Sequence, residues 1–438
     1  MGIESALLCL TTVGIGECES FMPQAIATWR KLQMDKLSSS LSASAFEEDI
    51  LDSLEHKGRA VFLSLRNSFA SIGFSESNIR DQYTFDKDPD GAFVLSKVKT
   101  SSTSRVSGLD VLVHLFMSQQ FLPVDYVEQT LDSRFFSELQ EVSLLQIHPE
   151  GATCQATVRI EPVNNFLVCA DRFPEDSSSI QSAWRPDHVY RPWDVSAQIY
   201  MRIVPQTRCE SVLEMCCGSG YVCLTAAQHF ARSVYGVDIN PRAIRFAEFN
   251  KKLNGIENIT TYCGDLFEPV QSRTFDRIVA HPPYVPALVD SPTYRALTYR
   301  DGGVDGERIS AQLIRAVPKH LSDGGEFHSY LVLSDRFDDP AELRVRKMLG
   351  EYGQEFDIAL LILAEQSPAS YLLKRSDSNP FTEVYEQKYE ACRQLGIVKF
   401  LSTVLTIRSR RGTSPTTIRN RAISWETVAA MADPIATA

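Results

Sequence analysis

Residues 211–408 alternate short apolar runs with amphipathic stretches, and this alternation constrains the fold more than any other feature. The intervening stretches space their apolar residues at three and four, which is the helical period. Strands that alternate with helices form an open, mainly parallel sheet covered on both faces. The sequence therefore predicts an α/β fold whose ligands bind beyond the carboxyl ends of the strands. The seven expected strands are 211–215, 233–239, 258–266, 275–281, 326–334, 357–365 and 400–408.

The part of the chain before this sheet has a different pattern. Residues 46–175 carry several helical patterns and then two alternating apolar runs around Val163-Asn164-Asn165, the signature of a hairpin. Short helices followed by a hairpin resemble a winged-helix domain, and we expect it to cover substrate or to dimerise. The expected parts are a flexible leader over 1–45, a helical domain over 46–175, a linker over 176–190, a main domain over 185–411 and a tail over 412–438.

Charge and composition narrow the function. The 438 residues have a formal net charge of -11, and an acidic chain is repelled by phosphate backbones, which disfavours a nucleic-acid substrate. The apolar N-terminus lacks a basic region and contains Glu4, so we expect neither a signal peptide nor a membrane span. One basic cluster, interpreted as a solvated tail or alternatively as a docking patch, comprises Arg408, Arg410, Arg411, Arg419 and Arg421.

The ten cysteines include no C-x-x-C pair, so we expect no zinc site and no other metal. They also lack the short, regular spacing of a small secreted disulfide framework. We therefore expect reduced thiols and a cytoplasmic protein.

Two of the expected strands end in residues suited to a nucleoside ligand. After the first strand, the sequence V-L-E-M-C-C-G-S-G contains Glu214, Gly218 and Gly220, and its glycines permit a tight turn and a close backbone approach. A G-x-G alone also occurs in ordinary strand-to-helix turns. Asp238 ends the second strand, where a carboxylate accepts ribose hydroxyls, although Asp238 or Asn240 can instead cap the following helix.

The next two strand ends complete the pattern. Asp265, after the third strand, can face an adenine edge with Leu266 on the ring, or can cap its own loop. The fourth strand ends in Ala280-His281-Pro282-Pro283-Tyr284, the most informative motif. Its two prolines stop the strand and remove two donors, which leaves backbone carbonyls free to accept hydrogen bonds. Tyr284 adds a flat face for a planar substrate group.

Together these motifs resemble the class I S-adenosylmethionine-dependent methyltransferases with an Asn- or Asp-Pro-Pro-Tyr motif, over roughly residues 190–410. The glycine loop is similar to theirs, with Cys216 where the first glycine usually stands. The stretch Y-R-D-G-G-V-D-G at 299–306 is similar to a region that follows the motif in release-factor glutamine methyltransferases. Residues 190–200 resemble their helix that closes over the cofactor, and the N-terminal domain resembles that of two-domain bacterial relatives.

The resemblance implies a Rossmann-like sheet, S-adenosylmethionine as cofactor, and methyl transfer to a nitrogen of a protein side chain or small metabolite. It implies that His281, Pro282, Pro283 and Tyr284 bind the acceptor, with His281 and Tyr284 catalytic. The cofactor-binding residues that it implies are Glu214, Cys216, Gly218, Gly220, Asp238, Ile239, Asp265 and Leu266.

His281 departs from the family pattern, in which an Asn or Asp and the next proline carbonyl hold the acceptor N–H groups. A neutral imidazole accepts one such bond, and it can also take a proton from a hydroxyl. An O-methyltransferase of a small natural product with His281 as base is therefore an alternative, and so is a packing role for His281.

Two alternatives come from other classes of protein. Gly218, Gly220 and Asp238 partly imitate the fingerprint of a nicotinamide-dependent oxidoreductase, but Tyr221–Cys223 occupy the place of its third glycine. The other alternative is a cofactor-binding module without catalysis.

Overall fold

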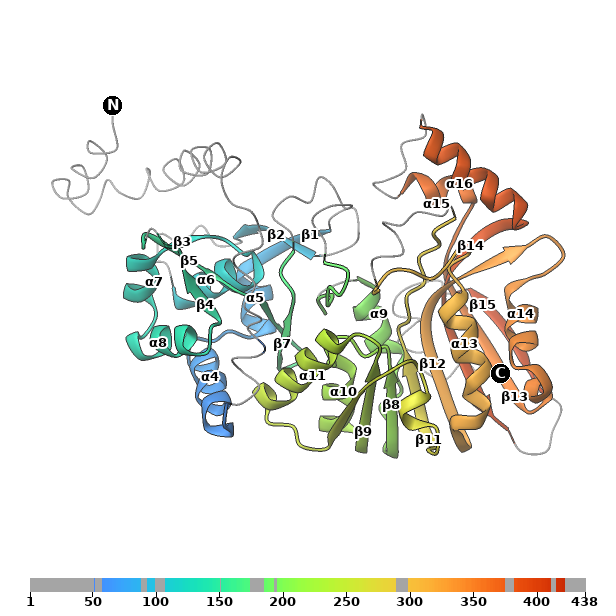
Figure 1. Ribbon diagram of the computed structural model, residues 1–438, viewed down its shortest axis with the longest axis horizontal. Helices are drawn as coiled ribbons and strands as arrows, with labels where there is room; N and C mark the ends of the chain where they lie inside the picture. Colours follow the sequence, from blue (N-terminus) through green and yellow to red (C-terminus); the bar gives the residue numbers. More distant parts are fainter. Residues whose placement is uncertain are drawn as a thin grey trace. The chain divides into compact units, whose positions relative to one another are not determined.

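A computed structural model describes residue 51 and residues 57–87, 93–98, 107–149, 151–173, 185–192, 195–288, 298–374, 382–410 and 415–421. Its main sheet has eight strands in the order β10-β9-β8-β11-β12-β14-β13-β15 (Figure 1). These strands are β8 (Cys209–Met215), β9 (Ala231–Asp238), β10 (Ile259–Cys263), β11 (Phe275–Ala280), β12 (Leu321–Arg336), β13 (Phe356–Gln366), β14 (Ile397–Ser409) and β15 (Thr417–Arg421). The seven predicted strands are confirmed, and β15 adds an eighth at the edge.

The order of the strands creates a switch point between β8 and β11. From β8 the chain proceeds outward to β9 and β10, and it then returns to place β11 on the other side of β8. The strands from β10 to β12 are parallel, whereas β14 is antiparallel to both of its neighbours. In open sheets of this kind, the crevice at a switch point is the place where ligands bind.

Alternating residues of the central strands face two separate cores, as the period of a strand requires. Val212 and Val279 pack with α10 (Tyr221–His229) and α11 (Pro241–Asn254). Leu213 and Ile278 point to the other face and pack with α13 (Arg308–His320) and α14 (Ala341–Met348). The prediction that helices cover both faces of the sheet is therefore confirmed.

The N-terminal region contains the element order of a winged helix in its second part, from residue 108 to residue 156: helix, strand, two helices and two strands. The described elements are α4 (Arg59–Ser71), α5 (Glu76–Gln82), β1 (Tyr83–Lys87), β2 (Phe93–Val98), α6 (Gly108–Leu112), the π-helix η3 (Val113–Met117), β3 (Leu122–Pro123), α7 (Val124–Thr130), α8 (Ser133–Glu141), β4 (Leu145–Ile147) and β5 (Thr153–Ala156). Strands β3, β5 and β4 form one small sheet. Residues 145–147 are a strand, although they end a stretch over 135–147 whose apolar residues are spaced at three and four, the helical period.

The expected hairpin is present as β6 (Arg159–Val163) and β7 (Phe166–Ala170). Its turn residues Asn164 and Asn165 have φ of 48° and 67°, and positive φ at both positions is what a type I′ hairpin turn requires. Both strands are buried along their whole length rather than on one face. The reason is that α11 packs against β7, whereas η3 and α5 pack against β6.

Two expectations about the ends and connections need correction, and a third lies outside the described residues. Residues 417–421, expected in the tail, form β15 beside β13. The linker is packed where it is described, because His188 is 2% exposed and the neighbouring Arg191 is 4% exposed. The leader over 1–45 lies outside the described residues.

The basic cluster is not a solvated tail at three of its five positions. Arg408 forms an ion pair with Glu326. Arg410 forms one with Asp357, with 3.1 Å between the guanidinium nitrogen and the carboxylate oxygen. Arg419 pairs with Asp335 and Glu342 at 2.7 and 2.9 Å. Because these ion pairs neutralise three of the five arginines, they also argue against the alternative interpretation as a docking patch. Arg421 is exposed, and Arg411 lies outside the described residues. Within the described ranges, no helix is long and apolar enough to span a membrane.

Candidate functional site at the carboxyl ends of the strands

The four sequence motifs stand next to one another along one edge of the sheet. Cys263 of β10 pairs with Asp238 of β9, and Val237 pairs with Met215 of β8. Met215 in turn pairs with Ala280 of β11. The residues that follow these strand ends, which include Asp265, Cys216 and His281, therefore share the edge where parallel sheets bind ligands.

The glycine loop is held by the carboxylate at the end of β9. The N–H of Gly218 donates to Oδ2 of Asp238 at 2.8 Å. Gly220 has φ of 74° and begins α10, and a Cβ there would lie 2.9 Å from the Cβ of Ala247. A Cβ on Gly218 would meet no atom within 4 Å, so this side of the loop is open to a ligand. Cys216, at the first position of the loop, has φ of 57°, in the region that favours glycine.

Asp238 does not cap the following helix. Asn240 caps α11, because its Oδ1 accepts the N–H of Arg242 at 2.9 Å. The Oδ1 of Asp238 accepts the N–H of Asn240 at 2.9 Å, and burial raises the pKa of Asp238. Each carboxylate oxygen therefore receives a backbone donor, and a carboxylate has about four acceptor sites in all. The carboxylate is positioned as a ribose acceptor needs, and this role stays a prediction.

Glu214 lies below the glycine loop at the start of α10. Its carboxyl group is 3% exposed, and Oε2 accepts the N–H of Cys223 at 2.7 Å. Burial raises the pKa of Glu214 to about 8, and the donated N–H only partly opposes this shift. No ion pair with Glu214 is found within the described residues, which leaves a buried acid without a cation.

The rim beside Asp238 carries an apolar surface. Ile239 is 57% exposed, which is unusual for an isoleucine that directly follows a buried strand. The carbonyl of Asp238 accepts the N–H of Gly264, and this bond places Asp265 and Leu266 next to the end of β9. Leu266 has φ of 44°, a left-handed conformation in a tight turn. The exposed Ile239 and the half-buried Leu266 form an apolar surface beside Asp238, and such a surface suits the flat face of an adenine.

His281 lies within an aromatic cluster, which we define as His281, Tyr200, Tyr284 and Tyr330. The ring centroids of the three tyrosines lie 5.2, 5.7 and 5.6 Å from that of His281, respectively. Burial among these rings lowers the pKa of His281 to about 4, so the imidazole is neutral near pH 7. Within the described residues, neither ring nitrogen of His281 and neither carbonyl of Pro282 and Pro283 has a hydrogen-bond partner.

The sequence motifs did not include Tyr200 and Tyr330. Tyr200 belongs to α9 (Val195–Ile203), within the stretch that resembles the cofactor-closing helix, but nothing in its spacing marked it. Tyr330 lies in the middle of β12 and carries no sequence signal.

The D-G-G-V-D-G stretch packs against the proline turn. The N–H of Gly302 donates to the carbonyl of Val285, and the N–H of Ala287 donates to the carbonyl of Gly303. A Cβ on Gly306 would lie 2.7 Å from the carbonyl oxygen of Tyr284, so only glycine fits there. Sequence similarity had linked the two stretches, and the structure places them in contact.

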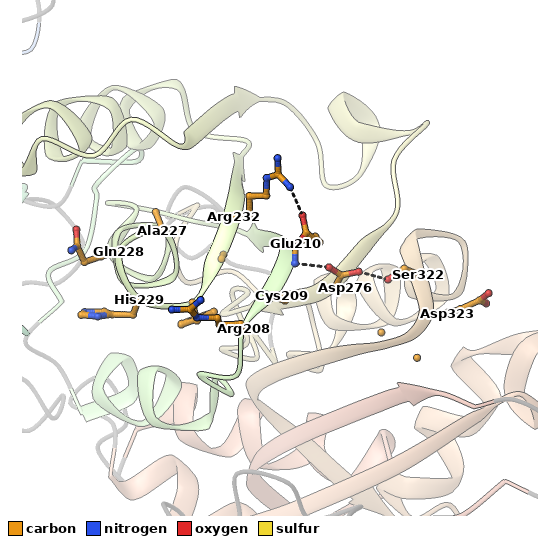
Figure 2. A pocket seen from close by; sticks show the side chains of 14 residues that line it. Arg208, Cys209, Glu210, Ala227, Gln228, His229, Arg232, Asp276, Ser322 and Asp323 are labelled. Atoms are coloured by element: carbon orange, nitrogen blue, oxygen red, sulfur yellow. Dashed lines mark hydrogen bonds and ion pairs between the residues drawn. The ribbon is translucent and has the colours of Figure 1, made fainter.

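A pocket of about 670 Å³ opens at the opposite edge of the sheet, at the amino ends of β8, β9, β11 and β12 (Figure 2). Its polar groups bind one another: Asp276 accepts the N–H of Glu210 at 2.9 Å and the hydroxyl of Ser322 at 2.8 Å. Arg232 pairs with Glu210, and both side chains are more than 70% exposed. This pocket lies away from the strand ends that carry the motifs.

Comparison with known proteins agrees with the fold and the motifs. A family model described as the methyltransferase small domain matches residues 189–352, which span the glycine loop, Asp238, Asp265 and the proline turn. The fold and the site together thus define an S-adenosylmethionine-dependent methyltransferase.

Three curated relatives narrow the class. A putative protein N5-glutamine methyltransferase of Methanocaldococcus jannaschii is 37% identical over 31% of this chain and 68% of its own length. A ribosomal protein uL3 glutamine methyltransferase of Bradyrhizobium diazoefficiens is 40% identical over 27% of this chain and 40% of its own. A release factor glutamine methyltransferase of Thermodesulfovibrio yellowstonii is 31% identical over 26% of this chain and 43% of its own. The chain belongs to the family of class I methyltransferases that contains these N5-glutamine methyltransferases.

The oxidoreductase alternative is not supported. The dinucleotide-binding fold has the strand order 3-2-1-4-5-6, whereas here the antiparallel β14 separates β12 from β13. The start of α10 is occupied by the buried side chains of Tyr221, Val222 and Cys223, where that fingerprint requires a glycine.

Proposed function

We propose that this protein methylates the side-chain amide nitrogen of a glutamine in another protein, with S-adenosylmethionine as methyl donor. The observation that carries the proposal is the proline turn, where unpartnered carbonyls and a neutral imidazole adjoin the glycine loop. The relatives named for protein glutamine methylation support the choice of acceptor.

The residues at the glycine loop suit the cofactor. Gly218 leaves open space, Asp238 has free lone pairs, and Ile239 is exposed. In this proposal Cys216, Gly218 and Gly220 line the methionyl part, Asp238 holds the ribose, and Ile239, Asp265 and Leu266 surround the adenine. When bound, the cofactor supplies a methyl group already activated on a sulfonium.

The proline turn then has the task of aiming the acceptor. A primary amide has two N–H donors. One ring nitrogen of His281 accepts the first, and the carbonyl of Pro282 accepts the second. Tyr284 covers the face of the amide. Holding the nitrogen in line with the methyl group supplies about 7–11 kcal/mol in well-oriented reactions.

The lowered pKa of His281 bears on the alternative acceptor. A base with a pKa of about 4 is a poor match for removing a proton from a hydroxyl near pH 7, where catalysis favours a base with a pKa near the operating pH. An amide nitrogen that has received a methyl group is far more acidic and needs no strong base. The proposal of nitrogen methylation is therefore preferred over an O-methyltransferase with His281 as base.

The N-terminal domain is proposed to select the acceptor protein. A cytoplasmic location stays a prediction. The cysteines within the described residues all have free thiols, as reduced surroundings would leave them.

The test is methylation of defined acceptors by the full chain. Recombinant release factor and ribosomal protein uL3 would be incubated with labelled S-adenosylmethionine, and the modified residue located by mass spectrometry. Label on a glutamine that disappears when that glutamine is replaced by glutamate supports the proposal. Label only on hydroxyls or on nucleic acid would contradict it.

The variant His281→Asn tests the role of the imidazole. It restores the residue type usual in the family, so we expect turnover to change while the affinity for S-adenosylhomocysteine stays the same. Loss of cofactor binding in this variant would contradict the assignment of His281 to the acceptor. Unchanged turnover would support a packing role instead.

A further inference from the structure

Tyr200, in α9, has a buried hydroxyl without a partner. The side chain is 3% exposed, and its oxygen makes no hydrogen bond within the described residues. Leaving a buried hydroxyl unpaired costs about 1–3 kcal/mol, and folded proteins seldom do so without reason. The hydroxyl therefore indicates a partner that is supplied from outside the chain.

The position of Tyr200 limits what that partner is. Its ring centroid lies 5.2 Å from that of His281, on the acceptor side of the site. After burial itself, the groups that raise the pKa of Tyr200 are Glu214 first and then Cys223, Cys216 and Cys217. All four belong to the glycine loop or the residues beside it. Tyr200 is thus next to His281, and the charged and polar groups of the glycine loop are near enough to act on its hydroxyl.

Glu214 is a second buried polar group in the same place. One of its carboxylate oxygens accepts the N–H of Cys223, and no described cation pairs with it. A nearby cation favours the charged form of a buried acid, and the resulting carboxylate beside a neutral hydroxyl suits an ammonium group, which has three donors and no acceptor. S-Adenosylmethionine carries an ammonium at its methionyl end, and the glycine loop is where that end is proposed to bind.

We propose that Tyr200 is a cofactor-binding residue, whose hydroxyl oxygen accepts a hydrogen bond from the α-ammonium group of S-adenosylmethionine beside the Glu214 carboxylate. The hydroxyl hydrogen remains available to the α-carboxylate of the same ligand. This assignment depends on the methyl donor of the proposed function but not on the glutamine acceptor. The two are therefore tested separately.

The experiment compares two ligands that differ in the amino-acid part. S-Adenosylhomocysteine has the α-ammonium and α-carboxylate, whereas 5′-methylthioadenosine lacks both. In calorimetric titrations of the full chain, Tyr200→Phe is expected to weaken the binding of S-adenosylhomocysteine about tenfold or more. The same variant should bind 5′-methylthioadenosine within about twofold of the unmodified protein, because the ring is retained.

Two further variants make the result decisive. Tyr352→Phe removes the same atom from a half-buried tyrosine in η5 (Gly350–Gln354), away from the motifs, and should change neither affinity. Glu214→Gln should show the same discrimination between the ligands as Tyr200→Phe. The variant that carries both Tyr200→Phe and Glu214→Gln should lose less binding free energy for S-adenosylhomocysteine than the sum of the two single losses. The reason is that both groups hold the same ammonium.

Three outcomes would overturn the assignment. One is unchanged affinity of Tyr200→Phe for S-adenosylhomocysteine, even if the acceptor KM rises, since the hydroxyl would then bind the acceptor. Another is an equal loss for both ligands, which would indicate a distorted loop. The third is a lower melting temperature of ligand-free Tyr200→Phe, because the hydroxyl would then have a partner within the protein. A failed glutamine assay leaves these binding results intact.

Discussion

Asn250 and Cys169 exchange two hydrogen bonds across the junction between the N-terminal hairpin and the main sheet. The Asn250 amide accepts the N–H of Cys169 at 2.8 Å and donates to its carbonyl at 2.9 Å. Asn254, one turn later on α11, makes the same pair of bonds with Leu167. Two side-chain amides thus replace a neighbouring strand along β7. Asn250 also donates to the carbonyl of Ser219 at 2.9 Å, which connects the hairpin to the glycine loop.

Replacement of Asn250 by alanine should lower the free energy of unfolding by about 2–4 kcal/mol, because three buried backbone groups lose their partner. Urea denaturation measures the change. Asn258→Ala is the control, since Asn258 is exposed and its three bonds are 3.2 Å long, and it should cost less than about 1 kcal/mol. Equal losses in the two variants would contradict this account of the junction.

The two glycines of the loop should respond differently to alanine. Both have positive φ, so both variants carry similar backbone strain. Gly220→Ala also forces a contact with Ala247 and should be the less stable protein, whereas Gly218→Ala meets only open space. Gly218→Ala should instead show the larger loss of affinity for S-adenosylhomocysteine relative to its loss of stability. Thermal unfolding and calorimetric titration compare the variants, and the reverse ranking would show that the open side of Gly218 does not face the ligand.

Asp238→Ala should weaken cofactor binding by roughly 1.5–3 kcal/mol, because it removes the acceptor of the ribose and the carboxylate that holds Gly218. Calorimetry with S-adenosylhomocysteine gives the change. Asp323→Ala, at the opposite edge of the sheet, provides a control with the same loss of charge. Unchanged affinity of Asp238→Ala would remove Asp238 from the site.

His281 should make the fold less stable in mild acid. Its pKa falls from 6.5 in the unfolded chain to about 4 in the folded protein, so the unfolded chain binds the proton first. The contribution of His281 is present above pH 6.5 and is lost as the pH falls toward 4, at up to about 1.4 kcal/mol per pH unit. Burial also lowers the pKa of His188 to about 4, and His188 is present in both proteins that are compared, so its contribution cancels. Urea unfolding at several pH values should give His281→Asn a shallower dependence than the unmodified protein, and parallel curves would refute the shift.

Much of the fold was predictable because local patterns report local burial. The seven strands, the covering helices and the hairpin turn at Asn164-Asn165 each follow from periodicity or turn chemistry within about ten residues. Strand β15 was missed because its five residues, Thr417–Arg421, form a short and largely polar edge strand. The partners of Arg419 were equally hidden, since Asp335 and Glu342 lie far away in the sequence.

The sequence by itself determined which residues stand at the ends of β8, β9, β10 and β11, because each motif directly follows a recognisable strand. Only the tertiary structure decided what surrounds them: the bond from Gly218 to Asp238, the aromatic cluster around His281 and the unpaired hydroxyl of Tyr200. The physical reason is that strand order and packing bring together side chains from distant elements. The pKa of His281 and the partners of Tyr200 are properties of that environment, and neither residue carries them alone.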